Sequence, residues 1–190
     1  MREPAEREEI RKDVILQKCF NVLTENGVEG ATIRNFSDAT GMTASSLYYW
    51  FEDKDEIIVD ATEFGLQYIV EKLFRYALDN INDVKNLCNE FYKIADKYKM
   101  ELRLIFQIAN SPKYGEKIRG HSDSLSHIYD EYMDKLANAM NVSSLDIRGS
   151  VDLFISAITY YVMWDDRLKV SREMEYVIRE IESCKIRKLS

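Results

Sequence analysis

The sequence has little cysteine, proline and glycine and no long apolar run, and each shortage excludes a class of protein. Its three cysteines, Cys19, Cys88 and Cys184, are odd in number and far apart, so we expect reduced core thiols and neither a disulfide framework nor a zinc knuckle. Two prolines and seven glycines leave long segments free to be helical. No stretch reaches the roughly 18 to 20 apolar residues of a membrane span, and no signal-peptide region follows the charged start. We therefore expect a soluble, cytoplasmic protein with no membrane partner.

Histidine is also scarce, and the common catalytic motifs are missing. His121 and His127 lie six residues apart, a spacing that suits neither a metal pair nor a base beside a nucleophile. The sequence contains no Gly-x-Ser-x-Gly, no glycine-rich phosphate loop and no HExxH. We predict that the protein is not an enzyme and holds no cofactor and no metal. Turnover of a bound ligand would contradict this prediction.

The N-terminal part of the sequence has the period and the capping residues of helices. A first helix is expected over about residues 6–26, with glycine beyond its end. Thr32 can cap the N-terminus of a short second helix through its side-chain hydroxyl, and a third helix is expected to start at Thr43. Asp53 and Glu56 have the spacing of a capping box, which predicts that a fourth, long helix begins there.

The helical period continues beyond residue 80, and no alternating strand pattern interrupts it. Pro112 ends one run, and later helices are expected from Ser143 or Ser144 and from a cap at Ser171. The segment 151–164 is apolar nearly all round, so it is either buried on every side or shared with a partner subunit. The fold class predicted is all-α, with about nine helices.

The charge of the chain is acidic, which counts against nucleic-acid binding. The formal net charge is −7, and the first 54 residues carry seven basic against ten acidic side chains, a local balance of −3. Phosphate contacts need cations, so DNA binding by this region would depend on a few well-aimed cations, hydroxyls and helix N-termini. A helical interaction module with weak or lost DNA binding therefore remains an alternative.

The most informative stretch runs from Thr32 to Lys54 and reads TIRNFSDATGMTASSLYYWFEDK. Ile33, Phe36 and Ala39 are expected to face inward, Gly41 permits a tight turn, and Met42 and Leu47 anchor the next short helix. One face of that helix is left free, with small side chains that allow entry into a major groove and hydroxyls that can bond phosphates or bases. The free face carries Thr43, Ala44, Ser45, Ser46, Tyr48 and Tyr49.

Over about residues 10–62 the sequence resembles the tetracycline-repressor family of transcription regulators. The segments ATG, MT, SSLYYWF and DKDE match that family's turn, recognition helix and the opening of its fourth helix. Met42, Ser45 and Trp50 replace the usual valine, glycine and histidine. The resemblance implies a helix-turn-helix DNA-binding domain at 1–54 and a larger helical domain for effector binding and dimerisation at 55–190.

The resemblance also assigns roles to single residues. Thr32, Thr43, Tyr49 and Lys54 match positions that hold phosphates, and Arg34, Ala44, Ser45 and Tyr48 match positions that approach bases. Lys54 has a physical reason as well, because it lies in the first turn of a helix, where its charge and the helix N-terminus can hold a phosphate together. For Tyr48 and Tyr49, packing against the protein remains the alternative.

For the rest of the chain, the resemblance implies a homodimer that encloses a small, apolar or aromatic effector. The helices around 144–165 and 171–185 would pair with their copies, and the dimer would present recognition helices about 34 to 36 Å apart to a palindromic operator. Such a regulator would be a repressor that its effector releases from double-stranded DNA. Ordinary core packing is the alternative for each candidate effector residue. These candidates are Phe64, Tyr68, Phe91, Arg103, Phe106, Gln107, Tyr129, Tyr132, Tyr161 and Trp164.

Overall fold

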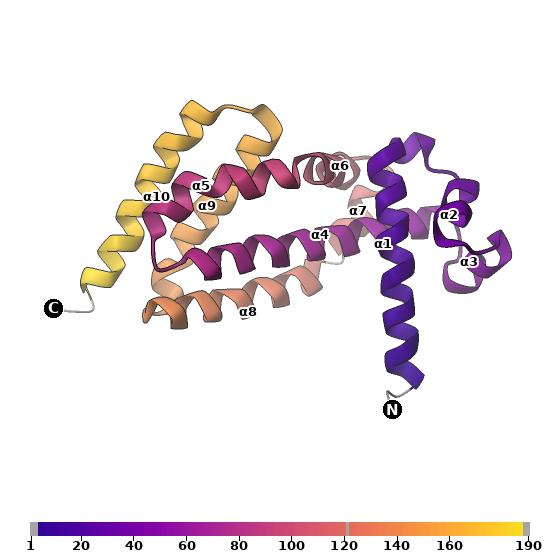
Figure 1. The fold of residues 1–190 in the computed structure, drawn as a ribbon, viewed down its shortest axis with the longest axis horizontal. Helices are drawn as coiled ribbons and strands as arrows, with labels where there is room; N and C mark the ends of the chain where they lie inside the picture. Colours follow the sequence, from indigo (N-terminus) through magenta and orange to yellow (C-terminus); the bar gives the residue numbers. More distant parts are fainter. Residues whose placement is uncertain (1–3, 121, 188–190) are drawn as a thin grey trace. The chain divides into compact units, whose positions relative to one another are not determined.

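The computed structural model describes the backbone of residues 4–120 and 122–187, and side chains over 11–120 and 126–184. Within these ranges the chain forms ten helices and no strand (Figure 1), which confirms the all-α prediction. The number of helices is one more than the sequence predicted. The six-residue α7 (Gly115–Gly120) is too short to produce an apolar period in the sequence. His121 lies outside the described residues, and His127 is exposed.

The chain divides into two compact units, Met1–Tyr68 with Met100–Asp123 and Ile69–Lys99 with Ser124–Ser190. The long helix α4 contributes to both. The helices of the first unit are α1 (Pro4–Gly30), α2 (Ile33–Thr40), α3 (Ala44–Trp50), the start of α4 (Lys54–Asn80), α6 (Lys99–Ala109) and α7. Those of the second unit are the rest of α4, α5 (Val84–Lys97), α8 (Ser122–Met140), α9 (Ser144–Trp164) and α10 (Arg167–Arg187).

In the first unit, α1 and α4 approach each other very closely. A β-carbon added to Gly65 of α4 would lie 2.4 Å from the ring of Phe20, a buried residue of α1. Glycine at position 65 therefore permits this approach. At the end of α1, Gly27 has a positive φ of 67°, so regular helix stops there as expected and a last turn follows to Gly30.

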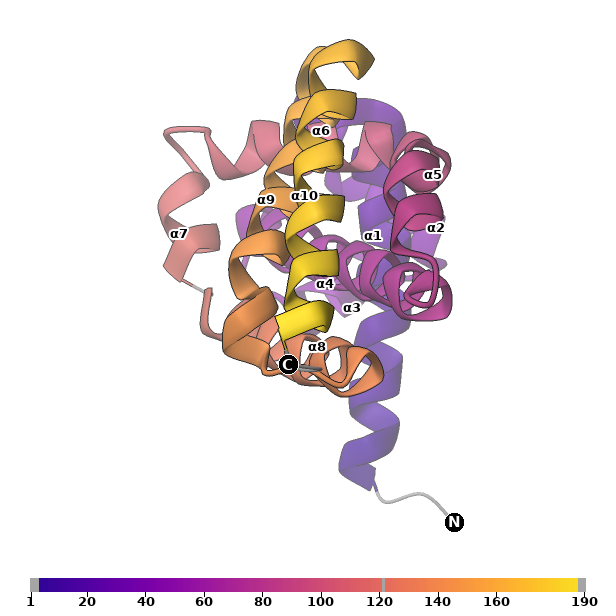
Figure 2. The same ribbon diagram turned by 90° about the vertical axis from the view of Figure 1, so that its left-hand side faces the viewer.

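In the second unit, α9 and α10 run side by side (Figure 2) and α5 packs against both. The predicted cap at Ser171 is wrong, because α10 begins at Arg167 and the Ser171 hydroxyl donates back to the Arg167 carbonyl. Asp165 adopts a left-handed conformation that ends α9, and the carboxylate of Asp166 accepts the Lys169 amide at 3.0 Å. Asp166 is thus the cap that Ser171 was expected to be.

A membrane-crossing helix would need a long apolar run, and none of the helices in the described ranges has one.

Candidate DNA-binding site

Helices α2 and α3 form a helix-turn-helix, in which Thr32 caps α2 as the sequence predicted and Thr43 caps α3. The Thr32 hydroxyl accepts the Asn35 amide at 3.2 Å, and the Thr43 hydroxyl accepts the Ser46 amide at 3.1 Å. Gly41 has a φ of 73° and donates its amide to the Ser37 carbonyl at 2.9 Å. A side chain at Gly41 would be strained in this conformation, so glycine makes the tight turn possible.

The inner side of the motif is formed by Phe36 and Leu47, which are both fully buried. Ile33 and Met42 are half-buried, whereas Ala39 is exposed, so the prediction that Ala39 faces inward is wrong. Four residues on from Ile33 and Phe36 lie Ser37 and Thr40, and both of these are half-buried.

The outer side of α3 is exposed along its length, from Thr43 through Ser46 and again at Tyr48 and Tyr49. Tyr48 is 47% exposed and Tyr49 is 80% exposed. The ring of Tyr49 meets Trp50 edge to face, with centroids 5.7 Å apart. A tyrosine that is four-fifths exposed buries little apolar area, so packing within this chain does not account for Tyr49.

Two further candidates flank this face. Arg34 on α2 has a side chain that is 90% exposed and lies 3.8 Å from the carboxylate of Asp38, at the outer limit of an ion pair. Lys54, the first residue of α4, is half-buried and donates its ammonium to the Ala31 carbonyl at 3.4 Å. Both side chains keep donor capacity for an anion.

At the N-terminus of α4, Asp53 is the cap that the sequence predicted, and the reciprocal bond from Glu56 reaches the residue before it. The Glu56 amide donates to the Asp53 carboxylate at 2.8 Å, and the Glu56 carboxylate accepts the Glu52 amide. Next to it, Asp55 accepts from the Lys113 ammonium at 2.7 Å and the Tyr114 hydroxyl at 2.9 Å. The hydrogen bond from Lys113 lowers the pKa of Asp55 below its ordinary value. These contacts occupy the carboxylates beside Lys54.

Four of the five candidate effector residues of the second unit belong to two groups of aromatic rings. Tyr132 stacks on Phe74 with centroids 4.9 Å apart, and Tyr129 meets the same ring at 6.1 Å. Phe91 and Tyr161 meet edge to face at 5.7 Å, and both are at most 1% exposed. Phe91 and Tyr161 therefore have the environment of core residues in this structure.

The other candidates are spread more widely. In the first unit Phe64, Arg103 and Phe106 are half-buried, Gln107 is exposed and Tyr68 is 38% exposed. In the second unit Trp164 is 70% exposed at the end of α9.

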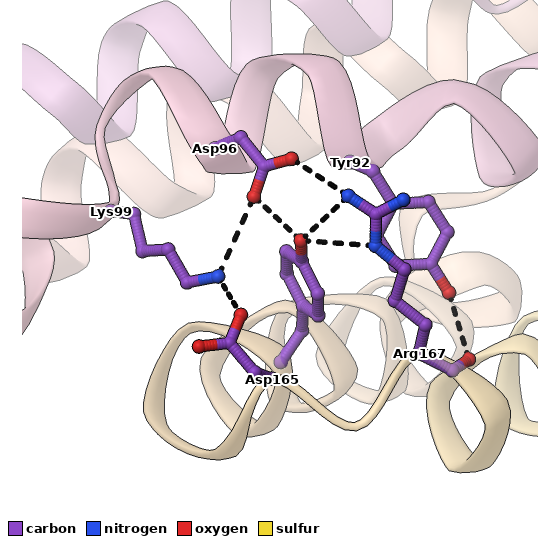
Figure 3. Close-up of polar contacts among 6 residues, drawn as sticks. Tyr92, Asp96, Lys99, Asp165 and Arg167 are labelled. Atoms are coloured by element: carbon purple, nitrogen blue, oxygen red, sulfur yellow. Dashed lines mark hydrogen bonds and ion pairs between the residues drawn. The ribbon is translucent and has the colours of Figure 1, made fainter.

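A polar cluster around Tyr161 was missed by the sequence analysis (Figure 3). The Tyr161 hydroxyl donates to Asp96 at 2.5 Å, and the Arg167 guanidinium donates to the other Asp96 oxygen at 3.0 Å and to the Tyr161 hydroxyl at 3.2 Å. Lys99 pairs with both Asp96 and Asp165, and the Tyr92 hydroxyl donates to the Arg167 carbonyl at 3.0 Å. The cluster fixes the α9–α10 turn against the end of α5.

Known proteins resemble this chain along most of its length, although no protein-family model matches it. The biofilm operon icaADBC HTH-type negative transcriptional regulator IcaR of Staphylococcus epidermidis is 23% identical over 146 residues, which cover 76% of this chain and 78% of that protein.

Among solved structures, a TetR transcription regulator from Haloarcula marismortui aligns with a TM-score of 0.55 at 14% identity, over 93% of this chain and 98% of that one. The transcriptional regulator FadR from Bacillus subtilis, in complex with stearoyl-CoA, aligns with a TM-score of 0.50 at 15% identity, over 88% of this chain and 96% of that one. The likeness includes the helix-turn-helix and the helices that follow it, and it agrees with the resemblance in residues 10–62. The chain has the fold of the TetR-family transcription regulators.

Proposed function

We propose that this chain is a ligand-responsive transcriptional regulator that binds a palindromic double-stranded DNA operator as a homodimer. The observation that carries the proposal is the outer face of α3, where hydroxyl-bearing and small side chains are exposed on a helix capped by Thr43. An exposed helix of this composition suits the major groove, because small residues allow close approach and hydroxyls bond phosphates and base edges.

Within this proposal, the residues divide into two roles. Thr32, Thr43, Tyr49 and Lys54 hold phosphates, since three of them lie at helix N-termini, where backbone amides favour an anion. The residues that approach bases are Arg34, Ala44, Ser45 and Tyr48. The Ser46 hydroxyl lies 2.9 Å from that of Thr43 and supports it.

The homodimer is proposed to form through α9 and α10. Both helices expose large apolar side chains, although they pack against each other on their inner sides. Such exposure is unusual for a surface that faces only water and is typical of subunit interfaces. The exposed apolar residues on and between these helices are Leu145, Ile155, Met163, Trp164, Leu168 and Tyr176.

The same proposal assigns a role to each domain: residues 1–54 bind DNA, and residues 55–190 dimerise and bind a small apolar or aromatic effector. Repression, with release by the effector, is the behaviour we propose because IcaR is a negative regulator and FadR was solved with an acyl-CoA. An effector can release the operator only by binding the free form more tightly than the DNA-bound form.

The test is selection of bound duplexes from a random DNA pool, followed by affinity measurements at several salt concentrations. Enrichment of a palindrome, with affinity that falls steeply as salt rises, is the expected result. Weak binding at low salt without an enriched sequence would reject the proposal. The acidic balance of the first 54 residues would then favour the second candidate, a helical small-molecule-binding or interaction module.

A further inference from the structure

The cations near the helix-turn-helix are few, and most of them already have oxygen partners. Lys12 on α1 pairs with Asp60 of α4 at 3.0 Å. Lys18 donates to the Thr40 carbonyl at 3.4 Å, as Lys54 does to that of Ala31. These contacts direct three of the available charges toward the protein itself.

Arg11 is different. It is exposed on α1, and within the part of the chain that the structure describes, no carboxylate or carbonyl oxygen contacts its guanidinium. Its contact is with an aromatic ring: the guanidinium carbon lies 5.9 Å from the centroid of Trp50, the last residue of α3. One residue further along, Lys12 lies over Phe51 in the same manner, at 5.5 Å.

The Trp50 ring connects Arg11 to the outer face of α3, because the same ring meets Tyr49 edge to face. Arg11 is therefore one ring away from the most exposed tyrosine of the recognition helix. A guanidinium over an aromatic face is oriented by the ring but keeps its N–H donors available, and these donors match two phosphate oxygens.

We propose that Arg11, oriented by Trp50, is a further phosphate-binding residue of the DNA interface. Trp50 is its positioning residue. The inference rests on the proposed function and adds a contact from α1, outside the helix-turn-helix. It also gives a physical role to Trp50, whose ring holds a cation from another helix beside α3.

The experiment measures binding of the full-length protein to its selected palindrome and to an unrelated duplex, by fluorescence anisotropy over a series of salt concentrations. For Arg11→Ala we expect about tenfold weaker binding to both duplexes, since a phosphate contact carries no base information. The slope of log affinity against log salt should fall by about 0.9 for each copy, or about 1.8 for a dimer.

Four matched variants separate the effect of charge from that of orientation. Lys85→Ala removes one exposed cation from α5, changes the net charge equally, and should leave the affinity and the slope as in the wild type. Arg11→Lys should retain the slope but lose affinity, because an ammonium cannot bind two phosphate oxygens in a fixed plane. Trp50→Leu should weaken binding with little change in slope, and Trp50→Phe should restore much of the affinity.

Circular dichroism and thermal unfolding of each variant verify that it folds. If Arg11→Ala and Lys85→Ala bind equally well with equal slopes, the inference is overturned. Weaker binding with an unchanged slope would also overturn it, because Arg11 would then act through the structure of α1. If the wild type binds no duplex, the proposed function fails, and the inference fails with it.

Discussion

Gly65→Ala is a direct test of the close approach between α1 and α4. The new methyl group would lie 2.4 Å from two atoms of the Phe20 ring and 2.6 Å from a third. Ordinary carbon contacts begin about 1 Å further out, at about 3.5 Å, so the ring has to move. Phe20 is only 3% exposed, which leaves it no open direction.

The expected change in the free energy of unfolding combines two opposite contributions. Overpacking of a filled core costs about 1–3 kcal/mol, while alanine in place of glycine inside a helix gains about 1 kcal/mol. The difference between the two is about 0–2 kcal/mol, and we expect Gly65→Ala to lower the free energy of unfolding by about 1 kcal/mol, the middle of that range. In a chain of this length the melting temperature should fall by about 2–4 °C for each kcal/mol.

The assay is thermal and urea unfolding at one fixed protein concentration, since the proposed dimerisation would make the melting temperature depend on concentration. A double-mutant cycle with Phe20→Leu assigns the loss to the predicted contact, because a smaller side chain leaves room for the methyl group. The double variant should lose less stability than the two single variants together. A Gly65→Ala protein as stable as the wild type, or additive effects in the cycle, would refute the reasoning.

Three other predictions follow from the same structure. Asp55→Asn should lower stability at neutral pH, and the difference from the wild type should vanish in acid. The hydrogen bond from Lys113 lowers the pKa of Asp55 in the folded protein, so the stability that the carboxylate contributes above the ordinary pKa of 3.8 is lost as pH falls through the folded pKa. Urea unfolding from pH 2 to 7 measures this difference, and a difference that stays constant with pH would contradict the prediction. Burial raises the pKa of Cys19 and Cys88 to about 12, so both thiols should resist alkylation by iodoacetamide at pH 8 until urea unfolds the protein. Rapid labelling of the native protein would argue against their burial. Asp96→Ala should lower the free energy of unfolding by about 1–3 kcal/mol, because it removes the acceptor of the buried Tyr161 hydroxyl. Asp134→Ala, at an exposed position, serves as the control, and equal melting temperatures of the two variants would contradict the assignment.

Local features of the fold were predictable from the sequence because their causes lie within a few residues. The cap at Thr32, the start of a helix at Thr43, the turn at Gly41 and the cap at Asp53 each depend on residues no more than four positions away. The Ser171 prediction failed for a related reason. Asp166 offers an equally short cap five residues earlier, and the turn after Trp164 selects it.

Features that depend on tertiary contacts were not predictable in the same way. Asp96 and Arg167 lie 71 positions apart, and their spacing carries no period or motif. The candidate effector residues illustrate a second difficulty. An aromatic side chain has the same sequence signature in a core as in a pocket, so the burial of Phe91 and Tyr161 emerges only from the structure.

The acidic balance of the first 54 residues affects how the proposed regulator would find its operator. Non-specific affinity for DNA depends on the number of phosphate contacts made by cations, and this region has few cations, some of them directed at the protein. In the proposed regulator, specific affinity would depend on the exposed hydroxyls, Arg34 and the fit of α3 in the groove, which the net charge hardly alters. A face of this kind should therefore bind random DNA weakly and keep a large ratio of specific to non-specific affinity. Each remaining cation should contribute a correspondingly large share of the salt dependence, which makes removal of Arg11 measurable.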